Sequence, residues 1–346
     1  MSSPSKRHIL VIGGAGYIGS VLCPVLLDAG HHVRVLDSLL YDNSDSLATI
    51  ADYEHFAFHH GDVRSANDVA AAMDGITDVV LLAALVGDPV CKRNPELARE
   101  TNLDGAQAVI RAAGEASVGR LVFASTCSNY GLRDDDTPAG EEDELHPLSL
   151  YAETKVQMEH ELLGNEHPFD PTVLRVSTAF GASPRMRFDL TVSEFTRELA
   201  LGHALEVYDA DTWRPYCHVS DISRAILMVL AAPADQVGGE VFNVGGDDSN
   251  HTKRSIVDAA LAALGGGEVK WSEGGVDARN YRVSFAKIQE RLGFFPDQTV
   301  EGAVRQLAKA IRAGMFSDVE SRSLRYRNYE LTTAGAGEGS GGGDAG

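Results

Sequence analysis

Hydrophobic and polar positions alternate in a regular way through the first half of the chain. Short apolar runs with the length of buried strands occur near residues 8–13, 32–37, 56–60, 77–82, 119–125 and 172–176. The stretches between them are longer and have helical character. Short strands that alternate with helices predict an α/β fold, a Rossmann-type doubly wound parallel sheet.

The pattern changes after about residue 178. Two further short runs, LEVYD and EVFNVGG, alternate with predicted helices near 189–201, 220–232, 252–264 and 299–312. We interpret residues 1–178 as the sheet domain, to which some later segments return, and 179–331 as a smaller substrate lobe over the carboxyl ends of the strands. Residues 332–346, which end in AGAGEGSGGGDAG, are predicted to be a flexible tail.

The first predicted strand leads into a glycine-rich turn, ILVIGGAGYIGS. Its glycines, Gly13, Gly14, Gly16 and Gly19, fit both the G-x-G-x-x-G and the G-x-x-G-x-x-G spacing. Glycines let the backbone turn sharply and approach a pyrophosphate, to which the following helix offers free N–H groups. The turn therefore predicts a dinucleotide site.

Asp37 ends the next strand, HHVRVLD, about 20 residues beyond the glycines. A carboxylate there accepts hydrogen bonds from an adenosine ribose and repels a 2′-phosphate, which favours NAD over NADP. Arg34 keeps the alternative open, because a nearby arginine can accommodate that phosphate. The simpler interpretation of Asp37 is an acidic residue in a loop.

Tyr151 and Lys155 stand four residues apart in LYAETK. A helix that begins after Ser149, a suitable N-cap, and runs through Leu162 would place both on one face. There the ammonium would lower the pKa of the phenol from its usual value of about 10. Such a pair occurs by chance on many helices, but after a dinucleotide turn it predicts an oxidoreductase site.

The composition excludes several other classes of function. A net charge of −20 without a basic cluster argues against nucleic acid as a partner. No apolar stretch has the length of a membrane span, and MSSPSKRH lacks the hydrophobic segment of a signal peptide, so a cytoplasmic location is expected. The four cysteines lack metal-ligand spacing, so neither a metal nor disulfides are expected.

Taken in order, the glycine turn, Asp37, FASTCSNYG and LYAETK resemble the extended short-chain dehydrogenase/reductases. Within these the chain resembles the NAD-dependent nucleotide-sugar epimerase/dehydratase family over residues 7–312 or so. The segments LAALVGDPVCKRNPELARETN, SPRMRFDLTVSEFT, WRPYCHVSDI and DARNYRVS are similar to a branch that includes the GDP-manno-heptose 4-dehydrogenase of bacterial capsule synthesis.

The resemblance implies roles for three catalytic residues. Tyr151 would take the proton of a sugar hydroxyl while the carbon beneath gives hydride to the nicotinamide. Lys155 would support the phenol and hold the nicotinamide ribose. Thr126 would bond the same hydroxyl; its neighbour Ser125 is easily confused with it, and a strand-end threonine without function is the alternative.

The resemblance also implies binding residues for NAD and for a nucleotide-diphosphate sugar. Cofactor contacts are expected at Gly13, Gly16, Tyr17, Ile18, Gly19, Asp37, Asp62, Val63, Ala83, Ala84, Asn102 and Lys155. Substrate contacts are expected at Thr126, Thr178, Arg185, Arg187, Arg214 and Arg279, since a diphosphate needs charge-assisted donors. Each arginine has the alternative of a solvated surface charge. A homodimer through helices near 95–117 and 150–165 is also implied.

Two departures from the family pattern bear on the reaction. Sugar 4,6-dehydratases carry an Asp-Glu pair directly after the catalytic Thr, where this chain has Cys127 and Ser128. Thr178 stands where the family often has Asn, after Arg175. We therefore expect a nucleotide-sugar epimerase with a 4-keto intermediate; the alternatives are a 4-dehydrogenase, less favourably a dehydratase, and a non-catalytic NAD-binding sensor or scaffold.

Overall fold

A computed structural model describes residues 6–133, 137–274, 279–316, 319, 324–328 and 331. Its main feature is a seven-stranded parallel sheet in the order β10-β6-β5-β4-β1-β2-β3. The strands are β1 (His8–Ile12), β2 (His32–Asp37), β3 (Phe56–His60), β4 (Asp78–Leu81), β5 (Arg120–Thr126), β6 (Asp170–Val176) and β10 (Glu240–Val244). The predicted α/β fold is confirmed. The predicted flexible tail lies outside the described residues.

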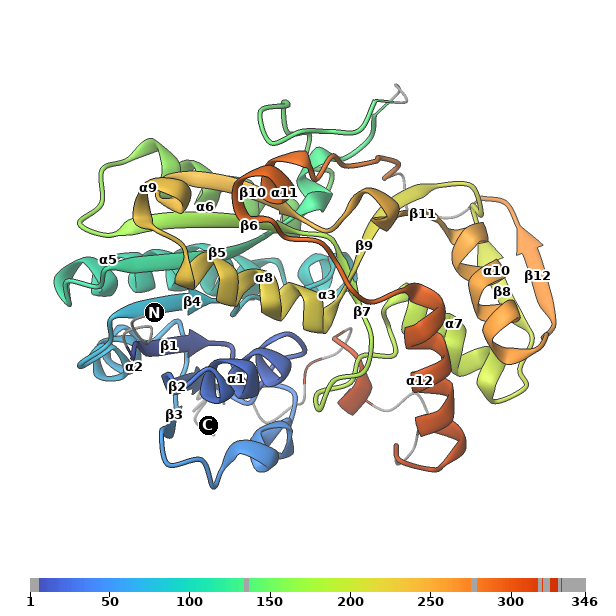
Figure 1. Ribbon diagram of the computed structural model, residues 1–346, viewed down its shortest axis with the longest axis horizontal. Coiled ribbons are helices and arrows are strands. Elements are labelled where there is room, and N and C mark those ends of the chain that lie inside the picture. The colour runs from blue at the N-terminus through green and yellow to red at the C-terminus, as the bar shows by residue number, and fades with distance from the viewer. Residues whose placement is uncertain are drawn as a thin grey trace, which may run out of the picture.

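Helices cover both faces of this sheet (Figure 1). One face carries α1 (Gly19–Asp28) and α8 (Val219–Ala231); the other carries α2 (Ala66–Met73), α5 (Ala106–Glu115) and α6 (Leu150–Gly164). Along β1, Ile9 and Val11 join the first apolar core, whereas Leu10 and Ile12 join the second. Burial on both faces explains why the strands are almost continuously apolar in the sequence.

One predicted assignment is corrected. The run EVFNVGG, expected in the smaller lobe, forms β10 and pairs in parallel with β6 from Glu240 beside Thr172 to Val244 beside Val176. It returns because α8, which precedes it, packs against α1 on the sheet, and the short α9 (Ala234–Val237) then turns the chain. A short apolar run in the sequence does not indicate which sheet the strand will join.

The elements after β6 that neither join the main sheet nor pack on it form a second group. Its helices α7 (Thr191–Ala200), α10 (Lys253–Leu264) and α12 (Val300–Arg312) pack together, as the sequence predicts. The small strands are β7 (Thr178–Phe180), β8 (Leu205–Tyr208), β9 (Trp213–His218), β11 (Asn250–Thr252) and β12 (Val269–Ser272), and α11 (Ala286–Leu292) packs on β10. In Figure 1 this group lies beyond one end of the main sheet.

The loop after β4 leads into a helix with an irregular middle. The chain forms α3 (Asp88–Arg93) and α4 (Pro95–Arg99), passes through a π-helical turn at Glu100–Gly105, and continues as α5. In the wide turn, Asn102 Oδ1 accepts from the Leu85 N–H at 2.7 Å. Its Nδ2 donates to the Leu85 carbonyl at 3.2 Å and to Thr154 Oγ1 at 3.3 Å. Asn102 thus joins the β4 loop to α6.

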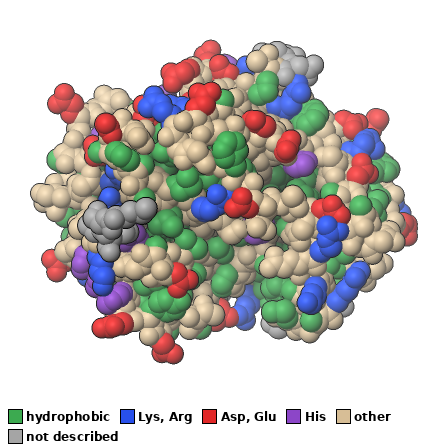
Figure 2. Space-filling view, viewed as in Figure 1, with side chains coloured by type: hydrophobic (Ala, Val, Ile, Leu, Met, Phe, Trp, Pro, Cys, Tyr) green, Lys and Arg blue, Asp and Glu red, His purple; other side chains and the backbone are tan. Residues whose placement is uncertain are grey.

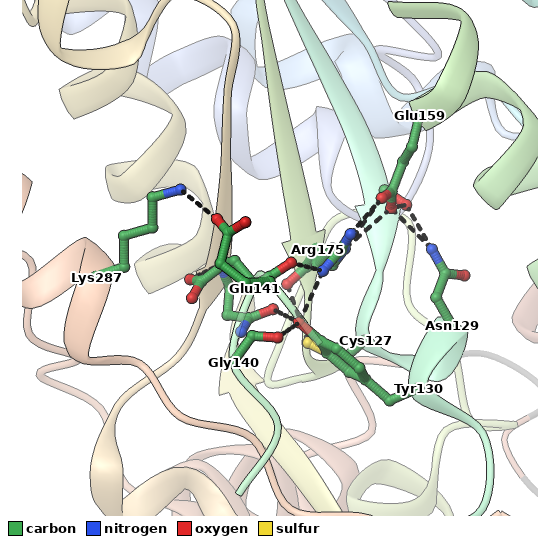
Figure 3. Close-up of polar contacts among 11 residues, drawn as sticks. Cys127, Asn129, Tyr130, Gly140, Glu141, Glu159, Arg175 and Lys287 are labelled. Atoms are coloured by element: carbon green, nitrogen blue, oxygen red, sulfur yellow. Dashed lines mark hydrogen bonds and ion pairs between the residues drawn. The ribbon is translucent and has the colours of Figure 1, made fainter. Parts of the chain in front are cut away.

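A buried ion pair joins α6 to β6 (Figure 3). The Nη2 atom of Arg175 lies 2.8 Å from Oε2 of Glu159, and the two side chains are only 6% and 1% exposed. Asn129 Nδ2 donates to Glu159 Oε1 at 2.8 Å, and Arg175 Nη1 donates to the Tyr130 hydroxyl at 2.9 Å. The pair is therefore satisfied by the short helical turn Cys127–Tyr130, which follows β5.

Replacing Glu159 with Gln should destabilise the protein by about 3–5 kcal/mol, because a buried guanidinium is left without its counter-charge. Urea unfolding followed by circular dichroism measures this loss. The matched control is Glu153→Gln, an exposed position on the same helix. Equal midpoints for the two variants would contradict the structural role of the pair.

Candidate functional site

A cavity of about 1030 Å³ lies at the carboxyl ends of the sheet strands, between them and the second group of elements. Its lining contains nearly every residue that the sequence predicts for the site: Gly13, Gly16, Tyr17, Ile18, Gly19, Asp37, Asp62, Val63, Ala83, Ala84, Thr126, Tyr151, Lys155, Thr178, Arg185, Arg187, Arg214 and Arg279. Asn102 is the exception. Its amide instead holds Leu85 and Thr154, so its role here is to position the cavity wall.

The glycine turn forms a cradle that side chains would fill. Gly13 has φ +88°, and a Cβ there would lie 2.7 Å from the Ala83 nitrogen. A Cβ on Gly19 would lie 2.4 Å from the Gly13 carbonyl oxygen. The turn therefore packs tightly against the end of β4 and the start of α1. Such a backbone surface with a helix N-terminus fits the pyrophosphate of a dinucleotide.

Asp37 faces the cavity beside this turn. Its carboxylate accepts the N–H of Ala15 at 3.0 Å and that of Leu39 at 2.9 Å. Burial raises the pKa of Asp37, and the two N–H groups oppose that rise. Arg34 points elsewhere, since its Nη1 donates to the carbonyls of Ala72 and Asp74 at 2.8 and 2.7 Å. The ribose end thus offers a carboxylate, while Arg34 is not placed to hold a 2′-phosphate.

The expected adenine contacts, Asp62 and Val63, follow β3 and line the cavity. Burial would raise the pKa of Asp62, but Arg64, whose Nη2 lies 2.7 Å from the carboxylate, lowers it overall. Asp62 is therefore an anion held by its own loop. Ala83 and Ala84 follow β4 and also line the cavity. Because β4 and β3 lie on opposite sides of β1, these alanines and Asp62 lie on opposite sides of the glycine turn.

Tyr151, Lys155 and Thr126 come together at one end of the cavity. Ser149 caps α6 by accepting the Ala152 N–H at 3.3 Å, so Tyr151 lies in the first turn. Lys155 follows one turn later; its Nζ donates to the Ala124 carbonyl at 2.6 Å and lies 5.9 Å from the Tyr151 ring centre. Thr126, at the end of β5, shares a 2.9 Å hydrogen bond with Ser128.

The electrostatics of Tyr151 differ from the sequence expectation. Burial raises the pKa of Tyr151; Cys91 and Asp88 add to this rise, and Arg187 and Arg279 oppose it. Burial also lowers the pKa of Lys155 to about 8, against the pull of Glu159. Desolvation raises the pKa of Tyr151 more than the neighbouring cations lower it. The protein side chains by themselves therefore do not give Tyr151 the lowered pKa that the sequence predicts.

Asp88 is a site residue that sequence reasoning missed. It lines the cavity, and its Oδ2 lies 3.2 Å from Nη1 of Arg279. Asp88 raises and Arg279 lowers the pKa of Tyr151, which lines the same cavity. In the sequence, Asp88 stands between Gly87 and Pro89 and resembles an ordinary helix-start residue.

The predicted substrate arginines have different surroundings. The Arg214 guanidinium lies 5.1 Å from the Tyr281 ring centre and donates to the carbonyls of Trp213 and Arg279. Arg187 makes a two-pronged pair with Asp189, with distances of 2.9 and 2.6 Å. That pairing lowers the pKa of Asp189 despite its burial.

Arg185 lies beside the first turn of α1, the helix that follows the glycine turn. Its backbone N–H contacts Ser20 Oγ, in the first turn of α1, at 3.4 Å, and its guanidinium lies 4.8 Å from the Tyr41 ring centre. The guanidinium donates to the carbonyls of Met186 and Arg327 at 3.5 and 3.2 Å. Burial, together with Arg187, lowers the pKa of Arg185 to about 10. A nearby anion would relieve this penalty.

The two positions after Thr126 differ in orientation. Cys127 is absent from the cavity lining; its Sγ donates to the Arg175 carbonyl at 3.1 Å, and burial raises its pKa to about 12. Ser128 does line the cavity, and its hydroxyl bonds to Thr126. Neither residue supplies a carboxyl group or a reactive thiolate at the catalytic end.

Other kinds of site find no support in the described part of the chain. No three His, Cys, Asp or Glu side chains there gather closely enough to hold a metal ion. None of the described helices combines the length and apolarity of a membrane-spanning helix. On the face in Figure 2, lysine and arginine side chains are interspersed with acidic ones over most of the surface.

Two curated proteins are similar to this chain over most of its length. The dTDP-glucose 4,6-dehydratase of Streptomyces griseus is 31% identical over 300 residues, covering 84% of this chain and 89% of the relative. The UDP-glucose 4-epimerase of Corynebacterium glutamicum is 28% identical over 312 residues, covering 84% and 91%.

Two solved structures share the fold and contain the cofactor. A Thermus thermophilus UDP-glucose 4-epimerase in complex with NAD has a TM-score of 0.77 and 27% identity, covering 88% of this chain and 99% of that one. DesIV, a dTDP-glucose 4,6-dehydratase from Streptomyces venezuelae with NAD bound, has a TM-score of 0.79 and 28% identity, covering 90% and 99%. The family model for the NAD dependent epimerase/dehydratase family matches residues 9–245, and the chain belongs to that NAD-dependent family.

Proposed function

We propose that the protein is an NAD-dependent nucleotide-sugar epimerase that works through a 4-keto intermediate. The observation that carries the proposal is the meeting of Thr126, Tyr151 and Lys155 at one end of a cavity, without a carboxyl group at the two positions after Thr126. When bound, NAD supplies a hydride acceptor and a positive charge that favours the phenolate of Tyr151.

Thr126, Tyr151 and Lys155 would each have a different role in the reaction of the sugar. Thr126 would bond the C4 hydroxyl, and Tyr151 would accept its proton and later return it. Lys155, held by the Ala124 carbonyl, would keep a positive charge beside the phenol. A binding sensor or scaffold has no need of such a proton relay, so this arrangement favours an enzyme.

The positions after Thr126 favour epimerisation over dehydration. Loss of water from C6 requires an acid for the departing hydroxyl and a base for the C5 proton. Cys127 lies in the core with a raised pKa, and Ser128 offers only a hydroxyl. The cavity carboxylates Asp88 and Asp189 are each paired with an arginine, Arg279 and Arg187 respectively.

The substrate we propose is a nucleoside diphosphate sugar, because the relatives include enzymes named for UDP-glucose and dTDP-glucose. Arg214 is best placed to bind its diphosphate, since it is fixed by carbonyls and by the Tyr281 ring. Arg185 is better suited to the pyrophosphate of NAD, because it lies beside α1 and Tyr41. We also propose that the protein forms a homodimer through the α5 and α6 region. Its proposed location is the cytoplasm.

Tyr151→Phe should lower turnover by at least the ~10²-fold typical of a lost acid–base group, while the fold and NAD binding stay nearly intact. The phenol hydroxyl is removed without changing the ring that fills the site. Steady-state kinetics, with calorimetric titration of NAD, measure both effects. Unchanged turnover would rule out Tyr151 as the proton acceptor.

Arg185→Gln should weaken NAD binding about tenfold or more, because a charge-assisted hydrogen bond is worth about 1.5–3 kcal/mol. Arg214→Gln, the matched control, should instead weaken binding of UDP-glucose or dTDP-glucose and spare NAD. Calorimetric titrations of both variants with both ligands separate the two sites. If Arg185→Gln lost affinity only for the nucleotide sugar, Arg185 would be a substrate-binding residue and not an NAD-binding one.

With its preferred nucleotide sugar in heavy water, the protein should form a product of unchanged mass, inverted at C4 and without deuterium on the ring. A returned hydride and a returned hydroxyl proton leave the ring carbons free of solvent hydrogen. Mass spectrometry and NMR of a panel of nucleotide sugars provide the measurement.

Each other product points to a different function. A product lighter by two hydrogens, with NADH accumulating, indicates a 4-dehydrogenase. A product lighter by one water, with deuterium at C5, indicates a dehydratase and overturns the argument from Cys127 and Ser128. NAD binding with no sugar turnover across the panel favours the sensor or scaffold.

A further inference from the structure

The chain comes back to the cavity after α12. The described residues there are 324–328 and Leu331, which we name the return segment; it begins with a single helical turn, Leu324–Tyr326. In Figure 1 this red turn lies between α12 and the side of the molecule that carries α1. Asn328 and Leu331 both line the cavity.

The return segment is anchored on the second group of elements. The buried Tyr326 ring packs edge-to-face on Phe188, with ring centres 5.4 Å apart, and the Tyr326 carbonyl accepts the Phe188 N–H at 2.9 Å. Two residues later, the Asn328 N–H donates to Asp189 Oδ2 at 3.2 Å. Asp189 is the partner of Arg187, so this anchor belongs to the cavity wall.

The same segment also contacts the opposite wall. Asn328 Nδ2 donates to the Val86 carbonyl, in the loop after β4, at 3.4 Å. Leu331 packs on the cluster that includes Leu85 and Cys91, on which Tyr151 also packs. Asn328 therefore links Asp189 on one wall to Val86 on the other.

The other end of the return segment lies near the glycine turn. Arg325 forms an ion pair with Asp45. The loop around Asp45 is held against the turn, because Asn43 Nδ2 and Ser46 Oγ both donate to the Ala15 carbonyl, at 2.7 and 2.9 Å. Of the described residues, Arg325 thus lies near the glycine turn, and Leu331 packs on the same cluster as Tyr151. A bound dinucleotide has to extend between the same two places.

We propose that the return segment is part of the cofactor site and retains NAD between turnovers, with Asn328 as the positioning residue that joins the two walls. Departure of the dinucleotide requires these contacts to break. The Arg325–Asp45 pair is half exposed and contributes little, so retention depends on the buried Tyr326 and Asn328. A cofactor regenerated in every cycle need not leave, which suits an epimerase better than a dehydrogenase.

Two truncations test the proposal. Ending the chain at residue 331 removes the glycine-rich tail and keeps the segment, whereas ending it at residue 323 removes both. The first should release NAD at the wild-type rate, and the second at least about tenfold faster. The dissociation rate is measured by dilution into an NAD scavenger and by the NAD that remains after gel filtration. Equal rates in all three proteins overturn the proposal.

A point substitution decides the question if the shorter chain fails to fold. Asn328→Asp keeps Tyr326 and the backbone N–H bond to Asp189 in place but sets a carboxylate oxygen against the Val86 carbonyl oxygen, which should open the link and speed NAD release several-fold at a nearly unchanged melting temperature. Asn165→Asp, at the exposed end of α6, is the matched control and should release NAD at the wild-type rate. Wild-type release from Asn328→Asp excludes the role of this residue.

These measurements use no sugar, so they stand apart from the proposed reaction. Slow NAD release from the wild type with fast release from Asn328→Asp supports the inference whichever sugar product is found.

Discussion

The geometry of the candidate site depends on the buried ion pair between Glu159 and Arg175. Glu159 lies on α6 one turn beyond Lys155 and two turns beyond Tyr151, and Arg175 lies on β6, which pairs with the strand that ends in Thr126. Locking α6 to β6 therefore sets the phenol and the ammonium relative to the threonine hydroxyl. Removing two charges from water is costly, and the surrounding hydrogen bonds offset that cost.

The same network extends toward the substrate side. Arg175 Nη1 donates to the Glu141 carbonyl at 2.9 Å, and the Ala139 N–H donates to the Arg282 carbonyl at 2.8 Å. The loop that contains Ala139 and Glu141 thereby connects the catalytic helix to the segment that begins with Arg279. One scaffold thus positions Tyr151 and Lys155, the proposed proton-transfer residues, together with Arg279, a proposed substrate-binding residue.

The parts that the sequence predicts are those encoded locally. Apolar runs identify the strands, the glycines identify the turn, and Ser149 identifies the start of α6. Long-range packing decides the rest. β10 joins the main sheet only because α8 carries the chain back, and Arg185 contacts the first turn of α1 although the two are far apart in the sequence.

The charge environment of the site could not be predicted from the sequence either. In the sequence, Asp88 resembles a helix-start residue. Its ion pair with Arg279 follows only from the fold. The pKa of Tyr151 follows from desolvation, which is a property of the closed cavity and not of the four-residue spacing from Lys155. Residue types were therefore easier to predict than the ionisation of those residues.

The π-helical turn at Glu100–Gly105 makes the site sensitive to chain length as well as to chemistry. A π-turn accommodates one residue more than an α-helix of the same path, and each residue of an α-helix advances about 100° around the axis. A single deletion in this turn would rotate α4 and Asn102 relative to α5. The side chain that holds Leu85 and Thr154 would then point away from both. Insertions and deletions here should be rarer among functional relatives than substitutions of the neighbouring surface residues.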